Sequence, residues 1–315
     1  MTSIAQVTAL VDAHVNRDYA RFRAVTLQIA AHSKSEQTAD YLRKLVGRQQ
    51  AQALTPLPSA NGLLSMPAEL ATLDDMVLAP ATRERLDRIV LEHDRRFDLM
   101  ARGLRPARKL LFTGLPGVGK TMSAGALATA VKMPLFRVEL HGVISQYMGE
   151  TASKLAKVFE HVRDMPAVYL FDEFDALGGD RSMSGGEAAG AEMRRVVNSL
   201  LQFIEDDRSD SLIVAATNHA QLLDPAIFRR FDETIAFEPL MISELIELIR
   251  RRLDGFEIGH LDYVAIYAAN PKLGHADLCA ALDRARKDHV LEGARIDTPR
   301  IVSEIARRAR PEALV

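Results

Sequence analysis

Hydrophobic residues follow two different patterns along the chain, and the change from one pattern to the other divides the chain into segments. Near the N-terminus, apolar residues return every three or four positions, which is the period of a helix that buries one face. These positions are Ile4, Val7, Leu10, Val11 and Val15, then Tyr19, Phe22, Val25 and Ile29, then Leu42, Leu45 and Val46. The pattern predicts an N-terminal helical module over residues 1–52. It serves either as a docking module for a partner or substrate, or as a cap on the main domain.

A stretch without any such rhythm follows the helical module. Proline and small polar residues interrupt it at Pro56, Pro58, Ser59, Asn61, Gly62 and Pro67. This composition is typical of a linker because it favours neither helix nor strand. We therefore expect a linker over residues 53–71.

From residue 72 to residue 239, short and continuously apolar runs alternate with helical periods. The runs that have the character of buried strands cover residues 109–113, 135–140, 167–171, 212–216 and 234–237. Buried strands that are joined by helices form parallel sheets covered on both faces. The pattern predicts an α/β fold, with a five-stranded parallel sheet in a large domain over residues 72–239.

Beyond Pro239 the strand-like runs stop and only helical periods remain. Leu245, Ile249 and Leu253 fall on one face of a helix, and further helical periods cover residues 261–269, 276–291 and 298–308. We expect a small all-helical domain over residues 240–315.

Composition narrows the class of protein without naming a function. Hydrophobic residues make up 48% and charged residues 26% of the 315 positions, which is ordinary for a globular protein with a real core. The formal net charge of −2 lacks the basic footprint of nucleic-acid-binding proteins. The single cysteine, Cys279, excludes an internal disulfide and is interpreted as core filler in a reducing compartment. We find neither an apolar run of the ~18 residues that cross a bilayer nor a signal peptide, and expect a cytoplasmic protein.

The strongest chemical signal lies directly after the first predicted strand. Residues 114–121 have the sequence Gly-Leu-Pro-Gly-Val-Gly-Lys-Thr, which fits the P-loop spacing G-x-x-x-x-G-K-[ST]. Glycines let the backbone N–H groups converge on phosphate oxygens, and the helix that follows directs its positive end at the same place. We expect Lys120 to reach the β- and γ-phosphates of ATP and Thr121 to bind Mg²⁺. The predicted nucleotide contacts are Gly114, Pro116, Gly117, Val118, Gly119, Lys120, Thr121 and Met122.

Polar residues at the ends of two later strands supply the remaining parts of a hydrolytic site. Asp172 and Glu173 follow the buried run 167–171, and Asn218 follows the run 212–216. We expect Asp172 to hold Mg²⁺ and Glu173 to orient and polarise the attacking water. The amide of Asn218 can hold that water or the γ-phosphate.

Three segments in this order, GLPGVGKT, VYLFDEFDAL and AATNHAQLLDPAIFRRFD, resemble those of AAA+ ATPases. The chain is similar, over about residues 70–290, to the group that includes proteasomal, membrane-protease and microtubule-severing motors. The resemblance implies that Asn218 is a sensor and that Arg229 and Arg230 are arginine fingers reaching into the site of a neighbouring subunit. It therefore implies a homo-oligomeric ring, usually a hexamer. The alternative for the two arginines is a surface ion-pair cluster with Asp232 and Glu233.

The resemblance also suggests roles for three loops. Gly274 and His275 match the lid segment that contacts the nucleotide, and residues 75–77 match the segment beside the adenine. Tyr147, Met148 and Gly149 occupy the position of an aromatic–hydrophobic–glycine loop that lines the central pore and grips an unfolded chain. Residues 178–190, rich in glycine and serine, match a second pore-facing loop.

The leading hypothesis is a ring-shaped ATPase that remodels, unfolds or threads a protein substrate chosen through the N-terminal helices. Its design resembles bacterial stand-alone AAA ATPases, including those that serve a separate protease in defence. The chain contains no H-E-x-x-H zinc-protease motif, so proteolysis would come from another protein. The alternative is a nucleotide-dependent switch or scaffold that regulates a partner without threading. A nucleic-acid motor is disfavoured by the near-neutral charge and the aromatic pore loop, and no membrane partner is expected.

Overall fold

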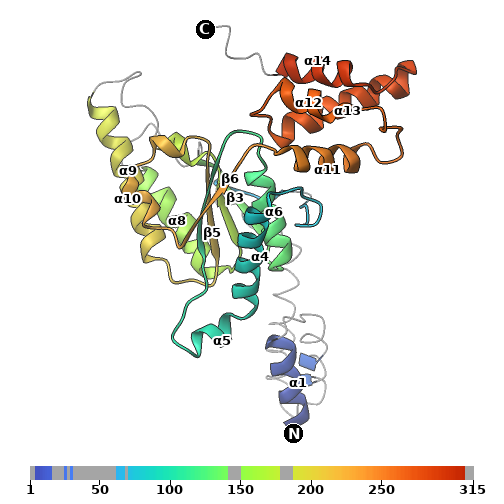
Figure 1. Ribbon diagram of the computed structural model, residues 1–315. Helices are drawn as coiled ribbons and strands as arrows, with labels where there is room; N and C mark the ends of the chain where they lie inside the picture. Colours follow the sequence, from blue (N-terminus) through green and yellow to red (C-terminus); the bar gives the residue numbers. More distant parts are fainter. Residues whose placement is uncertain are drawn as a thin grey trace. The chain divides into compact units, whose positions relative to one another are not determined.

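The computed structural model describes residues 4–15, 25–26, 29–30, 62–67, 70–140, 150–177 and 187–308. The chain forms two compact units, residues 1–61 and residues 62–315, and each is described by itself (Figure 1). In the first unit, helix α1 (Ile4–Val15) covers the first of the predicted helical periods. Val7 and Val11 on this helix are about half exposed, with 50% and 53% of their surface accessible. The remaining helices predicted for this module lie mostly outside the described residues.

The second unit is built on a six-stranded sheet with the order β1-β3-β4-β5-β2-β6. Its strands are β1 (Leu64–Ser65), β2 (Lys109–Gly114), β3 (Leu135–Val138), β4 (Val168–Phe171), β5 (Leu212–Thr217) and β6 (Glu233–Phe237). Every pairing among β2 to β6 is parallel. The predicted α/β fold and the predicted parallel strands are confirmed, and β4 and β5 are buried along their whole length.

The sixth strand, β1, is a difference from the prediction, because it lies inside the segment expected to be a linker. It pairs antiparallel with β3, with Leu64 opposite Val138. The Ser65 hydroxyl also donates a hydrogen bond to the Glu139 carboxylate at 2.6 Å. A strand of two residues is too short to show any periodicity, and its conformation depends on the partner strand rather than on its own sequence.

Helices cover both faces of the sheet (Figure 1). On one face, α4 (Pro80–Asp94) and α6 (Lys120–Ala130) share a core cluster with side chains of β2 to β6. On the other face lie α8 (Glu150–Asp164) and α9 (Glu187–Asp206), and Phe159 of α8 stacks on Phe171 of β4 with ring centroids 5.9 Å apart. The shorter elements are α5 (Arg96–Met100), η1 (Phe174–Leu177), η2 (Ala220–Leu222) and α10 (Pro225–Phe228).

The chain after the sheet forms four helices around a core of their own. They are α11 (Ile242–Arg252), α12 (Tyr263–Ala269), α13 (His275–Glu292) and α14 (Thr298–Arg308), which confirms the predicted helical periods. The Asp262 carboxylate caps α12 by accepting the N–H of Ala265 at 3.0 Å, and Gly293 ends α13 in a left-handed conformation. Cys279 on α13 is half-buried, and burial raises the pKa of its thiol.

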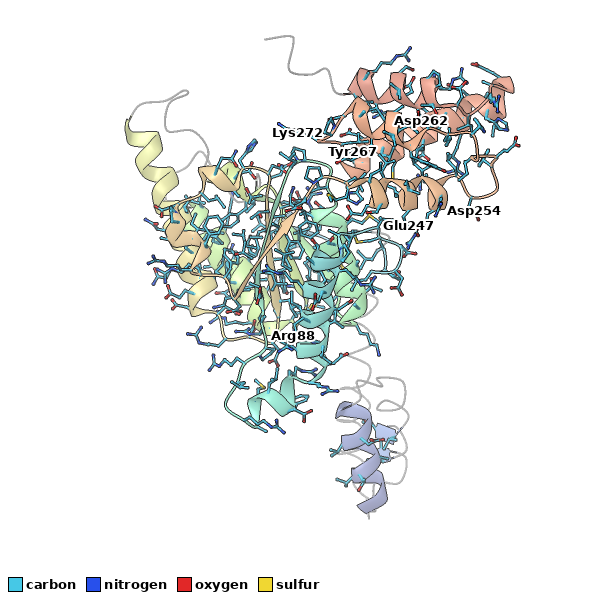
Figure 2. All side chains as sticks on the ribbon, viewed as in Figure 1. Arg88, Glu247, Asp254, Asp262, Tyr267 and Lys272 are labelled. Atoms are coloured by element: carbon cyan, nitrogen blue, oxygen red, sulfur yellow. The ribbon has the colours of Figure 1, made fainter. Side chains whose placement is uncertain are left out.

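Charged and polar side chains extend from these four helices and their loops (Figure 2). Glu247 on α11 pairs with Arg251 one turn later at 2.7 Å, and Figure 2 shows Asp254, Asp262 and Lys272 near the loops. Among the residues that the structure describes, no helix has the length and apolar character needed to cross a membrane.

Candidate active site

The loop between β2 and α6 folds into a tight turn because of its glycines. Gly119 stands immediately before α6 with φ 97° and ψ 11°, a left-handed conformation that residues with a Cβ rarely adopt. Helix α6 then begins at Lys120 and has no acidic residue in its first turn. The unpaired N–H groups and the positive end of the helix dipole therefore face the loop, which is the arrangement that binds phosphate.

Lys120 is held in place by oxygen atoms from two strand ends. Its ammonium nitrogen donates to the carbonyls of Gly114 and Leu115, at 2.7 and 2.8 Å, and to the side-chain oxygen of Asn218 at 2.8 Å. The residue is only 6% exposed. Burial lowers the pKa of this ammonium group, and the nearby carboxylates of Asp172 and Asp175 act in the opposite direction. The structure thus brings together Lys120 and Asn218, which the sequence places 98 residues apart.

Asp172 and Thr121, the two predicted metal ligands, are also neighbours. The hydroxyl of Thr121 donates to Asp172 Oδ2 at 2.8 Å, and the N–H of Glu173 donates to Asp172 Oδ1 at 3.0 Å. One carboxylate beside one hydroxyl suits Mg²⁺, which takes its other ligands from water and phosphates. No larger cluster of potential metal ligands occurs in the described part of the chain. Mg²⁺ bound there would neutralise charge on the phosphates.

Glu173 occupies a strained position at the end of β4. Its φ of 53° is positive, which among the described residues is shared by only one other non-glycine residue, Lys132. A left-handed backbone at a residue with a side chain costs of order 1–3 kcal/mol and is concentrated at functional sites. The strain marks the exposed Glu173 as a candidate for chemistry rather than packing.

Asp175 is a site residue that the sequence analysis missed. Its Oδ1 accepts hydrogen bonds from the Thr217 hydroxyl and from the backbone N–H of Asn218, both at 3.0 Å. Asp175 lies in η1, just after Asp172 and Glu173, and fixes the end of β5 where Asn218 stands. Its only sequence signal is an additional carboxylate three residues after Asp172.

The two predicted arginine fingers lie at the end of α10 and are exposed. Arg230 forms an ion pair with Glu205 of α9. The expected alternative partner, Asp232, instead accepts the backbone N–H groups of Arg108 and Lys109, both at 2.9 Å. In the described part of the chain, no hydrogen bond or ion pair connects Arg229 or Arg230 to Lys120 or the metal ligands.

The start of α13 packs directly on the P-loop. The N–H of Ala276 donates to the carbonyl of Gly117 at 3.0 Å. At Gly274 the two segments approach so closely that an added Cβ would lie 3.1 Å from the carbonyl of Gly117 and 3.2 Å from that of Pro116. The predicted lid segment and the P-loop therefore form one continuous surface.

His275 joins this surface to the segment predicted beside the adenine. Its Nε2 lies 2.6 Å from the carbonyl of Val77 and must carry the proton, because a carbonyl can only accept. Nδ1 is buried and has no hydrogen-bond partner in the described structure. Burial lowers the pKa of His275, because it disfavours the charged form of the ring. Asp75 does not reach this contact, since its carboxylate accepts from the N–H and hydroxyl of Thr72 at 2.8 and 2.7 Å.

The predicted pore loop of Tyr147, Met148 and Gly149 lies outside the described residues, as do residues 178–186 of the second predicted loop. The end of that second loop differs from the prediction. Residues 187–190 form the first turn of α9, which begins at Glu187. Glycine disfavours helix, and Gly190 together with Gly185 and Gly186 just before the helix concealed its start.

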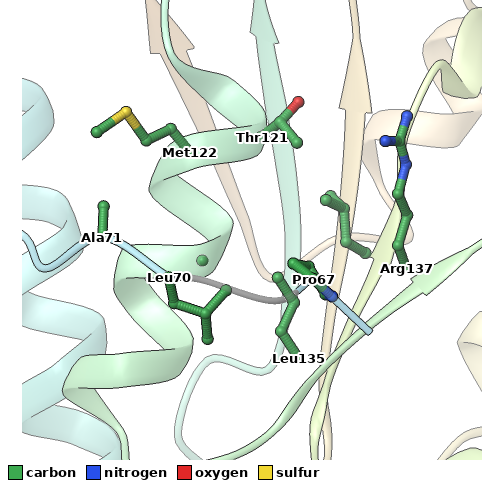
Figure 3. A pocket seen from close by; sticks show the side chains of 9 residues that line it. Pro67, Leu70, Ala71, Thr121, Met122, Leu135 and Arg137 are labelled. Atoms are coloured by element: carbon green, nitrogen blue, oxygen red, sulfur yellow. The ribbon is translucent and has the colours of Figure 1, made fainter. Parts of the chain in front are cut away.

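A cavity of about 380 Å³ lies beside the metal-ligand pair, between α6 and the edge of the sheet (Figure 3). Its walls are mostly apolar, and its polar lining residues are Thr121 and Arg137. Figure 3 shows both near one side of the cavity, with Leu70 and Leu135 lining the opposite side. The cavity is not lined by Lys120, Gly274 or His275, so it is distinct from the surface where the P-loop meets the lid.

The chain is similar in sequence to known proteins. The family model described as "ATPase family associated with various cellular activities (AAA)" matches residues 110–239. An uncharacterized AAA family ATPase of Sinorhizobium fredii, y4kL, is 40% identical over 243 residues, which cover 72% of this chain and 73% of the relative. A 26S proteasome regulatory subunit of Arabidopsis thaliana, S10B homolog B, is 30% identical over 64% of this chain. The ATP-dependent zinc metalloprotease FtsH of Thermus thermophilus is 31% identical over 76% of this chain.

The coverage of these relatives differs. The alignment spans 54% of the proteasomal subunit and 39% of FtsH, so the chain corresponds to part of each. It spans most of the Sinorhizobium protein. The matching family model and this well-covered relative agree with the fold and with the motifs, and the chain belongs to the AAA family of ATPases.

Proposed function

We propose that this ATPase uses ATP hydrolysis to remodel, unfold or thread a protein substrate, as one subunit of a homo-oligomeric ring. The observation that carries the proposal is the convergence at one sheet edge of Lys120 with Asn218 and of Thr121 with Asp172. A protein that only bound nucleotide would need the P-loop but would not need these strand-end groups. We take residues 72–239 as the ATPase domain and residues 240–315 as its lid.

Each side chain then has a defined task. Lys120 binds the phosphates, and Thr121 and Asp172 hold Mg²⁺. Glu173 takes a proton from the attacking water, and Asn218 orients that water or the γ-phosphate. Gly274 and His275 border the nucleotide from the lid side.

The arginines complete the site from a neighbouring subunit. Arg229 and Arg230 are both exposed. Arg230 pairs with Glu205 on the surface and would exchange this partner for the phosphates of the neighbouring site. Arginine fingers accelerate phosphoryl transfer by about 10³–10⁵ in GTPases. A hexamer is the ring that we expect, and the need for a neighbour makes assembly a condition of activity.

The names of two relatives support the proposal that the substrate is a protein. One is a proteasome regulatory subunit and another is an ATP-dependent metalloprotease. We propose that the N-terminal module, residues 1–52, selects the substrate or binds an adaptor or a separate protease in the cytoplasm.

Mixing two inactive variants tests the shared site. Glu173→Gln lacks the catalytic base but keeps its arginines, and Arg229→Ala lacks a finger but keeps the base. Each alone should hydrolyse ATP slowly, whereas a mixed ring places an intact arginine beside an intact Glu173. Recovery of turnover on mixing supports the proposal. Full activity of Arg229→Ala alone, at protein concentrations down to the lowest measurable, would contradict it.

A second variant separates threading from switching. Tyr147→Ala should keep ATP turnover and lose the unfolding of a tagged fluorescent protein. Unfolding that is unaffected by this change would favour the nucleotide-dependent switch.

A further inference from the structure

Asp172 has a cationic neighbour that no motif predicts. Arg137 is the third residue of β3, which pairs in parallel with β4, and its Nη2 lies 3.5 Å from Asp172 Oδ2. The same oxygen accepts the hydrogen bond from Thr121 at 2.8 Å. Arg137 therefore approaches the carboxylate at the atom that is turned toward the other predicted metal ligand.

The register of the sheet explains how Arg137 reaches this place. Arg137 pairs with Leu170, and Asp172 follows two residues after Leu170 on the adjacent strand. Arg137 and Leu135 are two residues apart on β3, so their side chains lie on the same face of the strand. Both line the cavity beside α6 (Figure 3). A long side chain on the neighbouring strand can therefore extend along the sheet edge to the carboxylate.

The Arg137 side chain is loosely held. It is 42% exposed, whereas the side chain of Asp172 is only 14% exposed. The contact at 3.5 Å is an ion pair without a hydrogen bond of good geometry. The open cavity leaves the guanidinium room to turn away from Asp172. A charged group with these properties can leave its partner at low cost.

Two cations cannot share one carboxylate oxygen without repelling each other. A divalent ion held by Thr121 and Asp172 would lie within a few ångströms of the guanidinium, where like charges interact strongly even at an effective dielectric constant of about 20. Arg137 must then move away or weaken the binding of the ion.

We propose that Arg137 is a built-in counter-cation of Asp172 that competes with Mg²⁺ for this carboxylate. It holds Asp172 in position when no metal is bound, and it lowers the affinity of the site for magnesium-bound ADP, which favours product release. This inference rests on the proposed role of Thr121 and Asp172 as the metal ligands.

The test measures binding rather than turnover. The full-length protein is titrated with a fluorescent ADP analogue over a series of Mg²⁺ concentrations and, separately, in EDTA. For Arg137→Gln, we expect the Mg²⁺ concentration for half-maximal tight binding to fall by about three- to ten-fold, the scale of a partly exposed ion pair opposed to a divalent ion. Binding of the analogue in EDTA should not change.

Control variants separate this role from others. Arg137→Lys keeps the charge and should retain a midpoint close to wild type, and Arg137→Met keeps the apolar stem if the glutamine variant folds poorly. Arg88, which pairs with Glu92 at 2.7 Å on α4 away from the strand ends (Figure 2), offers a matched ion-pair control. Arg88→Gln should leave the midpoint unchanged.

Three outcomes would overturn the proposal. An unchanged or higher midpoint in Arg137→Gln would show that Arg137 does not compete with the metal. Weaker binding in EDTA would make it a phosphate ligand instead. Magnesium-independent binding in the wild-type protein would remove the metal assignment itself. Failure of ring assembly or substrate unfolding leaves the binding result intact, because the assay requires neither.

Discussion

The contact between the lid and the P-loop leads to a sharp prediction for Gly274→Ala. Gly274 precedes α13 with φ −82° and ψ 159°, a conformation open to any residue, so backbone strain plays no part. The obstacle is space, since the new methyl group would lie 3.1 Å from the carbonyl carbon and oxygen of Gly117. Both atoms belong to the backbone of a tight loop and cannot rotate aside.

The magnitude follows from the displacement that relieves this contact. Moving the start of α13 back by a few tenths of an ångström lengthens the hydrogen bond from Ala276 to Gly117, now 3.0 Å. Overpacking of this kind costs about 1–3 kcal/mol, and a weakened hydrogen bond about 0.5–1.5 kcal/mol. The lower entropy of the unfolded alanine chain returns about 0.4–1 kcal/mol. We therefore expect a net loss of about 0.5–4 kcal/mol in the free energy of unfolding.

The loss should appear at the nucleotide site as well as in stability. The strained contact joins the predicted lid to the P-loop, so part of the lost free energy should weaken ADP binding. A loss of about 1.4 kcal/mol in the free energy of binding would raise the Kd for ADP about ten-fold. Titration with a fluorescent ADP analogue measures the Kd, and urea denaturation measures the stability.

Gly259→Ala is the matched control for this experiment. Gly259 lies in the same helical part of the chain, has no positive φ, and has no heavy atom within 4 Å of an added Cβ. The same chemical change there should leave ADP binding intact and the protein at least as stable as wild type. If Gly274→Ala and Gly259→Ala behave alike in both assays, the close packing of the lid on the P-loop does not exist in solution, and the reasoning fails.

Three further changes test the supporting contacts. Asp175→Ala should slow ATP turnover by up to about 100-fold while ADP still binds, because Asn218 loses the acceptor that positions it; normal turnover would contradict this. Tyr169→Phe removes a buried hydroxyl that lies 2.6 Å from Nδ1 of His161, and should lower the free energy of unfolding by about 1–3 kcal/mol in urea denaturation. The pKa of His275 is lower in the folded protein than the value of about 6.5 in the unfolded chain. The folded protein should therefore be most stable above about pH 6.5 and lose stability as the pH falls below it, because the unfolded chain then binds the proton first. Unfolding midpoints between about pH 5 and 8 should show this slope, and His275→Asn should reduce it.

Much of the fold was accessible from the sequence because its signals are local. The strands β4 and β5 are continuous apolar runs, and the P-loop is a contiguous motif whose glycine fixes the turn before α6. Asp172 and Asn218 could be predicted as site residues because each follows a recognisable buried strand, and parallel strands end at one edge of the sheet.

The features of the fold and of the candidate site that the sequence did not predict arise from contacts between segments that are distant in the chain. Strand β1 has two residues and exists only through its contact with β3. Arg137 has no motif around it, and its approach to Asp172 depends on the register of β3 against β4. Asp175 was overlooked because its role is to bind Asn218, which lies 43 residues later. Sequence patterns identify the elements, whereas these contacts appear only when the elements are placed side by side.

The hydrogen bonds of Lys120 connect the P-loop to the end of β5, and the P-loop in turn contacts α13. Its ammonium group is already satisfied by three oxygens, so it can bind a phosphate only by giving some of them up. Two of these oxygens belong to Gly114 and Leu115 at the base of the P-loop, and the third belongs to Asn218. A few residues along the same loop, Gly117 accepts the hydrogen bond from the lid. Any change in the loop that accompanies phosphate binding or loss is therefore transmitted through Gly117 to α13, which makes the lid the element whose movement should follow the state of the nucleotide.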